Sequence, residues 1–154
     1  MAAQSHIEPP HIVVRGDAHS FKQEITAGKH RLLADEPVST GGGDAGPDPY
    51  DYLLASLAVC TSMTVGFYAR RNQFPLENIT VSLWHSRIYA KDCEECETTE
   101  GMLDRLDVEV ELTGSLNEAQ HAKLMEIAAK CPVHRTLTSE INVRLRAASK
   151  ASAP

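Results

Sequence analysis

The chain has 154 residues, and 15 Lys and Arg stand against 21 Asp and Glu, which gives a formal net charge of −6. This length suits one domain with its own hydrophobic core. An acidic balance provides no positive field for a phosphate backbone, so we expect no nucleic-acid partner. Hydrophobic residues make up 42% of the chain and charged residues 23%, the balance of a folded globular protein rather than a disordered one.

The N-terminal third contains three short segments with the composition of strands. We predict these strands at residues 13–15, 21–26 and 31–34. Turn residues separate them, so the strands should form a small antiparallel meander over about residues 11–35. The stretch 39–49 that follows is rich in Gly and Pro and is predicted to be a loop.

A long helix is predicted from Pro49 to about Arg71. Asp48 is a suitable N-cap, and proline is favoured at the first helical position. Residues 52–69 carry no charge and approach the length of a membrane-spanning helix. Because hydroxyl side chains interrupt this run and no belt of aromatic and basic residues precedes it, we interpret it as a helix buried in a globular fold and expect no membrane association.

The C-terminal half is predicted to fold as a ββαβ unit over about residues 78–146. Alternating residues predict strands at 78–89 and 106–113, joined by a polar, acidic loop at 91–104. A helix starting at Ser115 or Asn117 and ending at Cys131-Pro132, a short helical turn at 133–137 and a last strand at 141–145 follow, with a frayed tail at 147–154. The whole chain, 1–154, is therefore predicted to be a single α+β domain.

The first fourteen residues have neither a basic segment followed by an apolar run nor a cleavage signal, so we expect no secretory signal and a cytoplasmic location. Thiols are kept reduced in that compartment. We therefore expect the four cysteines to be reactive, metal-binding or simply buried rather than structurally bridged.

Two of the cysteines belong to predicted helices. Cys60 continues the apolar face of the long helix, where a small buried hydrophobe is the first interpretation and a catalytic thiol the second. Cys131 precedes Pro132 and is predicted to be an N-cap, where the positive end of a helix stabilises a thiolate. Core and catalytic roles are both open for Cys131, and His134 follows it closely enough to lie near the thiol.

Cys93 and Cys96 form a CxxC motif among acidic residues. Neighbouring carboxylates disfavour the thiolate form, which argues against a thioredoxin-like role. The spacing also suits two zinc ligands, with His85 as a third, but there is no second CxxC. The remaining interpretation is an exposed acidic loop whose thiols oxidise opportunistically, and we predict no metal site.

Two longer segments surround the helix cysteines. Residues 46–64 read GPDPYDYLLASLAVCTSMT, and residues 130–137 read KCPVHRTL. In order and separation, these segments resemble the OsmC/Ohr family of thiol-dependent peroxidases. The resemblance covers most of the chain, from residues 35–37 to the last predicted strand. It implies a two-layer OsmC-like fold with antiparallel sheets and a long central helix, assembled as an intertwined homodimer.

The resemblance also implies a reaction. Cys60 would attack an organic hydroperoxide at the dimer interface, and Cys131 would resolve the product through an intramolecular disulfide. A thiolate attack gives a sulfenic acid, which a second thiol condenses to a disulfide. An unidentified dithiol would regenerate the pair, and neither a metal nor an organic cofactor is required.

One position departs from the family pattern. Peroxidases of the family carry a Glu ten residues before the helix cysteine, paired with an Arg, whereas Tyr50 stands there in this chain, next to Asp51. Glu36 or Asp51 are the candidate acidic substitutes, and Arg15 or Arg31 are the candidate cations.

This departure supports an alternative function. A non-catalytic OsmC-like dimer would sense oxidants by bridging Cys60 to Cys131 without turnover, or would bind an apolar small molecule.

Overall fold

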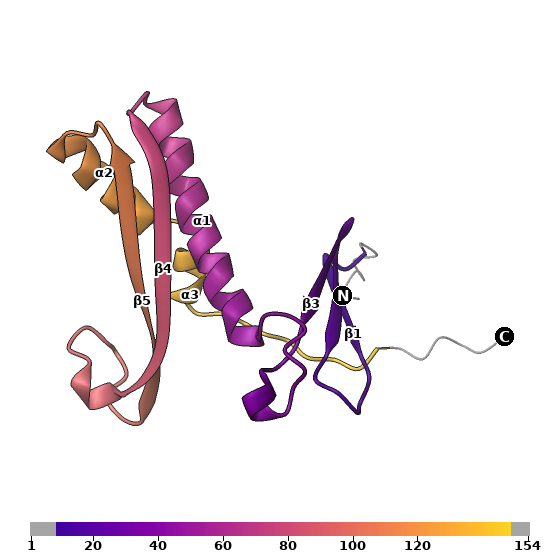
Figure 1. Ribbon diagram of the computed structural model, residues 1–154. Coiled ribbons are helices and arrows are strands. Elements are labelled where there is room, and N and C mark those ends of the chain that lie inside the picture. Colours follow the sequence, from indigo (N-terminus) through magenta and orange to yellow (C-terminus); the bar gives the residue numbers. More distant parts are fainter. Residues whose placement is uncertain (1–8, 149–154) are drawn as a thin grey trace, which may run out of the picture. The chain divides into compact units, whose positions relative to one another are not determined.

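The computed structural model describes residues 9–148. The chain divides into two compact units, residues 1–55 and residues 56–154, with one long helix beginning in the first unit and continuing into the second. Figure 1 shows the order of the elements along the chain.

The first unit contains the predicted meander. Strands β1 (Ile12–Gly16), β2 (Gln23–Ala27) and β3 (His30–Ala34) form an antiparallel sheet in the order β1-β2-β3. The second strand begins two residues later than predicted, because the turn after β1 is wider. There Asp17 accepts hydrogen bonds from the backbone N–H of His19 (2.7 Å) and from the hydroxyl of Ser20 (3.2 Å). Such side-chain bonds to nearby groups favour turns over strands.

A buried carboxylate organises the loop that leads to the long helix. Asp35 is 4% exposed and accepts backbone hydrogen bonds from Glu36 (2.8 Å), Gly43 (3.1 Å) and Ala45 (3.1 Å). Burial acts to raise the pKa of Asp35, but the three amides outweigh it and hold that pKa below its ordinary value. Gly42 passes so close to the carbonyl of Glu36 that a Cβ has no room there. The predicted loop therefore has a defined shape, with one 3₁₀ turn at Val38–Thr40.

Helix α1 (Pro49–Arg71) has the bounds predicted from the sequence. Asp48 caps it by accepting a hydrogen bond from the N–H of Asp51 at 2.8 Å, and the Asp51 carboxylate accepts the N–H of Asp48 in return at 3.2 Å. By length and composition α1 could cross a membrane, and 28% of its most apolar window is buried. The sequence predicted a helix buried in a globular fold, whereas in the described chain one side of α1 belongs to the core and the opposite side is exposed.

The second unit is built on a long hairpin. Strands β4 (Leu76–Tyr89) and β5 (Met102–Gly114) pair antiparallel, with Val81 opposite Val110. Both strands extend beyond the predicted bounds because hydrogen-bonded pairing continues through less apolar residues. The segment between them starts with a 3₁₀ turn at Ala90–Asp92.

Two short helices complete this unit. Helix α2 (Glu118–Ala128) begins with a capping box between Asn117 and Gln120, which decides between the two predicted starting points in favour of Asn117. Helix α3 (Pro132–Leu137) follows at once. Figure 1 shows α1 running along the hairpin, with α2 in the same unit. The buried core consists of Val65, Ala69, Leu124 and Ala128.

The predicted last strand at 141–145 is wrong. Residues 140–148 have no regular secondary structure, and the side chains of Ile141, Val143 and Leu145 are 52%, 85% and 101% exposed. A strand exists only where a neighbouring strand takes up its backbone hydrogen bonds, and no strand of the described chain pairs with this segment. Of the predicted frayed tail, residues 149–154 lie outside the described residues.

Candidate functional site

The second unit holds both helix cysteines as free thiols. Cys60 lies on α1 and is half-buried, whereas Cys131 precedes α3 and is 0% exposed. The two thiols therefore differ in access, since solvent reaches only the first. A reactive thiol has to be reached by its substrate, so this difference bears directly on which cysteine can react first.

The sulfur of Cys131 accepts two hydrogen bonds. The backbone N–H of His134 donates to Sγ over 3.3 Å, and the hydroxyl of Thr61 donates to Sγ over 3.5 Å. The first of these is the N-cap bond of α3, so the N-cap predicted from Pro132 is confirmed. The prediction that His134 lies near the thiol is confirmed for its backbone.

Thr61 links the two sequence motifs. It is 3% exposed, follows Cys60 directly on α1 and contacts a sulfur 70 residues further along the chain. Sequence reasoning missed Thr61, because a hydroxyl within an apolar helical run has no feature that names its partner. The contact joins the motif around Cys60 to the motif around Cys131.

The three supporting residues predicted from the sequence belong to the first unit. The Asp51 carboxylate takes part in the α1 cap, and Glu36 accepts the Thr40 hydroxyl over 3.4 Å. The Arg31 guanidinium donates to the carbonyl groups of Gly28 (3.3 Å) and His30 (3.2 Å). Within residues 9–148, no ion pair or hydrogen bond joins Asp51, Glu36 and Arg31 to one another.

The second cysteine pair behaves differently from the expectation of unbridged thiols. Cys93 and Cys96 form a disulfide, with their Cα atoms 5.5 Å apart. His85, the third zinc ligand considered from the sequence, lies instead with Nε2 2.9 Å from Asp104 Oδ1. In the part of the chain that the structure describes, no three His, Cys, Asp or Glu side chains are arranged to hold a metal ion. Because the two cysteines of a CxxC motif are only three residues apart, they can form a disulfide without any contact from the rest of the fold.

Comparison with known proteins agrees with this architecture. The family model described as OsmC-like protein matches residues 41–146, a stretch that includes Cys60, Thr61 and Cys131. No curated protein matches the chain significantly.

Several solved structures share the fold. A putative osmotic stress induced and detoxification response protein from Psychrobacter arcticus superposes with a TM-score of 0.65 at 16% identity, over 84% of this chain and 88% of that one. An organic hydroperoxide resistance protein OsmC from Legionella pneumophila gives 0.60 at 20% identity, over 87% and 92%. The organic hydroperoxide resistance protein OhrB of Bacillus subtilis gives 0.56 at 17% identity, over 86% and 93%.

At these identities the solved structures establish a shared α+β fold with antiparallel sheets and a long helix. The family model covers more than half of the chain, and its range spans both cysteine motifs. The resemblance inferred from the two motifs is therefore confirmed, and the chain belongs to the OsmC-like protein family.

Proposed function

We propose that this protein reduces organic hydroperoxides in the cytoplasm, with Cys60 as the attacking thiol and Cys131 as the resolving thiol. The observation that carries the proposal is the contact of Thr61 with Cys131, because it brings the two cysteine motifs together within one unit. The Legionella pneumophila and Bacillus subtilis structures that share the fold are of organic hydroperoxide resistance proteins.

The reaction would proceed in three steps. The Cys60 thiolate attacks one peroxide oxygen, an S–O bond forms, the O–O bond breaks, and the alcohol leaves with a proton. The Cys131 thiolate then attacks the Cys60 sulfur, and the sulfenic oxygen leaves as water after protonation. An external dithiol finally reduces the Cys60–Cys131 disulfide and is itself oxidised to a disulfide. Neither a metal nor an organic cofactor takes part.

The different exposure of the two thiols supports this assignment of roles. A bulky hydroperoxide needs an approach to sulfur, which half-buried Cys60 offers and fully buried Cys131 does not. The hydrogen bonds from Thr61 and His134 hold the Cys131 sulfur in place in the interior, which suits a resolving role. Cys131 precedes a helix, as the sequence predicts, but a sulfur that the hydroperoxide cannot reach cannot make the first attack.

The resemblance also implies a carboxylate and a cation for the reaction at Cys60, and their identity in this chain stays a prediction. Tyr50 stands where family peroxidases carry a Glu, so Asp51 or Glu36 would provide the carboxylate and Arg31 the cation. The Asp51 carboxylate already caps α1, and Arg31 already binds turn carbonyl groups. Glu36, with one hydroxyl partner, is the least committed of these side chains.

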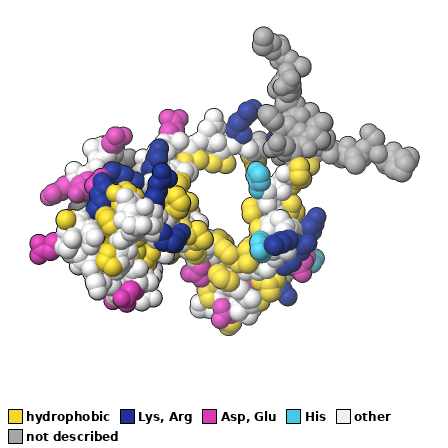
Figure 2. Space-filling view, turned by 90° about the horizontal axis from the view of Figure 1, so that it is seen from above, with side chains coloured by type: hydrophobic (Ala, Val, Ile, Leu, Met, Phe, Trp, Pro, Cys, Tyr) yellow, Lys and Arg dark blue, Asp and Glu magenta, His cyan; other side chains and the backbone are white. Residues whose placement is uncertain are grey.

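A homodimer is the second part of the proposal. Val59, Met63 and Phe67 are 51%, 67% and 58% exposed, and their spacing of four residues places them in one stripe on α1 beside Cys60. Figure 2 shows hydrophobic side chains, in yellow, at the surface of both units. A second copy of the chain has the same exposed apolar stripe and the same apolar 141–145 segment outside any sheet. It is therefore a partner whose apolar surface matches this one.

Rapid mixing of the reduced protein with a bulky organic hydroperoxide and with hydrogen peroxide tests the activity. We expect fast, selective oxidation by the organic compound and a mapped Cys60–Cys131 disulfide. Cys60→Ser should lose the reaction, Cys131→Ser should stop at a trappable sulfenic acid, and a Cys93→Ser/Cys96→Ser control should react like the unmodified chain. Oxidation no faster than that of a free thiol, or a bridge confined to Cys93–Cys96, would contradict the proposal.

The replacement of the family Glu by Tyr50 keeps a second function open, that of an oxidant sensor. A sensor would form the Cys60–Cys131 bridge once and consume one equivalent of hydroperoxide even with excess dithiol. An enzyme would consume many equivalents. Counting equivalents under identical conditions separates the two, and fast bridging without any peroxide selectivity would point to an apolar-ligand binder that oxidises incidentally.

A further inference from the structure

The tip of the β4–β5 hairpin carries a closed loop with a disulfide. The N–H of Ala90 donates to the carbonyl of Gly101 over 2.8 Å, and the N–H of Cys93 donates to the carbonyl of Ala90 over 3.1 Å. Ala90 is 1% exposed, so the base of the loop is packed. The Cys93–Cys96 disulfide is therefore held by an ordered segment of the second unit.

This loop has a high density of negative charge. Residues 90–104 contain six carboxylates and one lysine, a net charge of −5. Two of the carboxylates, Glu94 and Glu95, lie between the cysteines, and both are exposed. The two arginines of the adjoining strands are paired with carboxylates, since Arg87 lies 3.8 Å from Asp104 and Arg105 lies 2.9 Å from Asp107, and Lys91 lies over the Tyr89 ring. A group that approaches the disulfide therefore meets a negative field.

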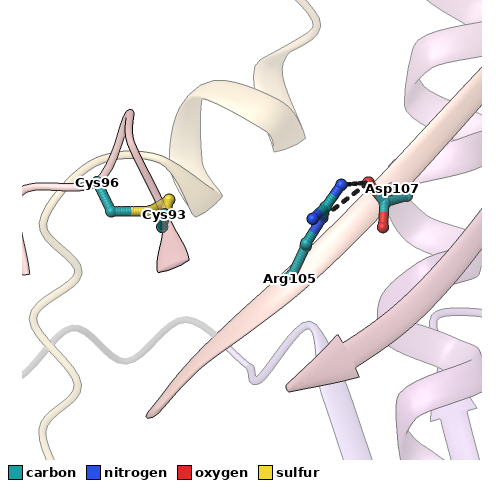
Figure 3. Close-up of a disulfide and its surroundings, with 4 residues drawn as sticks. All are labelled: Cys93, Cys96, Arg105 and Asp107. Carbon is teal, nitrogen blue, oxygen red and sulfur yellow. Dashed lines mark hydrogen bonds and ion pairs between the residues drawn. A yellow bond between two sulfur atoms is a disulfide. The ribbon is translucent and has the colours of Figure 1, made fainter. Parts of the chain in front are cut away.

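The disulfide is also accessible. Cys93 and Cys96 are each half-buried and line an open cavity of about 520 Å³. Ile88, Leu103 and Leu106 are its apolar lining residues, and the ion-paired Arg105 and Asp107 of β5 line it as well. Figure 3 shows the disulfide and this ion pair together. A thiol has room to reach the sulfur atoms from this cavity.

We propose that Cys93–Cys96 is a second thiol–disulfide exchange site, and that its acidic loop selects the charge of the reductant. Neutral or cationic dithiols, including a dithiol protein with a basic surface around its own cysteines, reduce the site, whereas anionic thiols such as glutathione are held off. This site does not depend on the function proposed for Cys60 and Cys131.

The exchange at Cys93–Cys96 takes two steps. A thiolate of the dithiol attacks one sulfur of the disulfide, a mixed disulfide forms, and the released cysteine thiolate takes up a proton. The second thiol of the reductant then displaces the other cysteine. Two electrons and two protons pass to Cys93 and Cys96, and the reductant becomes a disulfide.

The charge of the loop acts on both reactants. A field of one sign changes association rates of charged partners by about tenfold or more and weakens as salt increases. Carboxylates near the cysteines also disfavour the departing thiolate, which slows reduction by every thiol. The slow exchange keeps the CxxC oxidised, and the charge of the loop decides which reductants are slowed least.

The test uses the full chain with Cys60→Ser and Cys131→Ser, so that one disulfide is reported. Rates of reduction by glutathione, neutral dithiothreitol and cationic cysteamine are measured by alkylation and mass mapping, normalised to thiolate concentration. Salt is varied from about 0.01 M to about 1 M, over which the Debye length falls from ~30 Å to ~3 Å. We expect the ratio of the cysteamine rate to the glutathione rate to be about tenfold larger at low salt than at high salt.

Two variants with equal charge changes locate the effect. Glu94→Gln/Glu95→Gln/Glu97→Gln should remove most of the preference, and Glu77→Gln/Glu109→Gln/Glu111→Gln, which alters exposed carboxylates of the hairpin strands, should keep it. A preference that is insensitive to salt, or that both variants lose equally, would overturn the proposal. So would a disulfide that no small dithiol reduces in the folded protein, because that result would mean a purely structural bond.

Discussion

The hydroxyl of Thr61 donates a hydrogen bond to the sulfur of Cys131 over 3.5 Å, although 70 residues separate them in sequence. Both groups are buried, so water cannot replace the lost partner if either is changed. The backbone N–H of His134 provides the second donor to the same sulfur. Cys131 is thereby fixed beside the segment of α1 that contains Cys60.

Replacement of Thr61 tests this contact. Thr61→Val keeps the shape of the side chain and removes the donor, at a cost of about 1 kcal/mol in the free energy of unfolding. We expect Cys60 oxidation to keep its rate and formation of the Cys60–Cys131 disulfide to slow severalfold, as measured by rapid quenching and mass mapping. Thr64→Val, one turn further along α1 and only half-buried, is the matched control and should change neither rate. Equal rates of disulfide formation in all three proteins would refute a positioning role for Thr61.

The exposed stripe of α1 predicts the oligomeric state. We expect a dimer by sedimentation, and Phe67→Glu should yield a monomer because a charge cannot be buried unpaired at an apolar interface. Val38→Ala, which alters an exposed apolar residue of the first unit, should leave the dimer intact. If the unsubstituted protein sediments as a monomer at all accessible concentrations, the proposed homodimer is wrong.

The buried core predicts a large effect at α2. Leu124 is 0% exposed and packs with Val65, Ala69 and Ala128. Leu124→Ala should lower the free energy of unfolding by about 2–5 kcal/mol, since it removes buried methyl groups and leaves a cavity. Denaturation by urea gives this value. Met125→Ala, at the next position and 37% exposed, should cost less than about 1 kcal/mol, and similar costs for both would show that α2 packs in another orientation.

The pKa of Asp35 predicts a dependence of stability on pH. Burial acts to raise this pKa, but the amides of Ala45, Glu36 and Gly43 hold it below the ordinary value of 3.8. A carboxyl with a lowered folded pKa stabilises the fold at pH above 3.8, and this contribution is lost as the pH falls through the folded pKa. Acid titration should therefore show unmodified protein and Asp35→Asn converging in stability below pH 3.8 and differing above it.

The matched control for this titration is Glu24→Gln, which removes an exposed carboxylate of β2 in the same unit. We expect its difference from the unmodified protein to stay constant over the acid range. A stability difference for Asp35→Asn that does not change with pH would mean that the amides hold the side chain by shape rather than by its charge.

The sequence by itself determined the elements whose signals are local. The bounds of α1 follow from the Asp48 cap, Pro49 and a continuous apolar run, and the α3 N-cap follows from Cys131-Pro132. The hairpin was predictable because apolar and polar residues alternate along two strands that follow one another in sequence. The two cysteine motifs were enough to identify the family. In each of these cases the determining interactions lie within a few residues or within one hairpin.

Only the tertiary structure decided what depends on distant neighbours. The alternating pattern at 141–145 predicted a strand, yet pairing needs an edge that the described chain does not offer, so this segment is not a strand. The exposure of Cys60, the burial of Cys131 and the donor role of Thr61 all follow from the packing of α1 against residues some 70 positions away. Local chemistry sets which backbone shapes are favoured, whereas burial and long-range hydrogen bonds exist only once separate segments have been brought together.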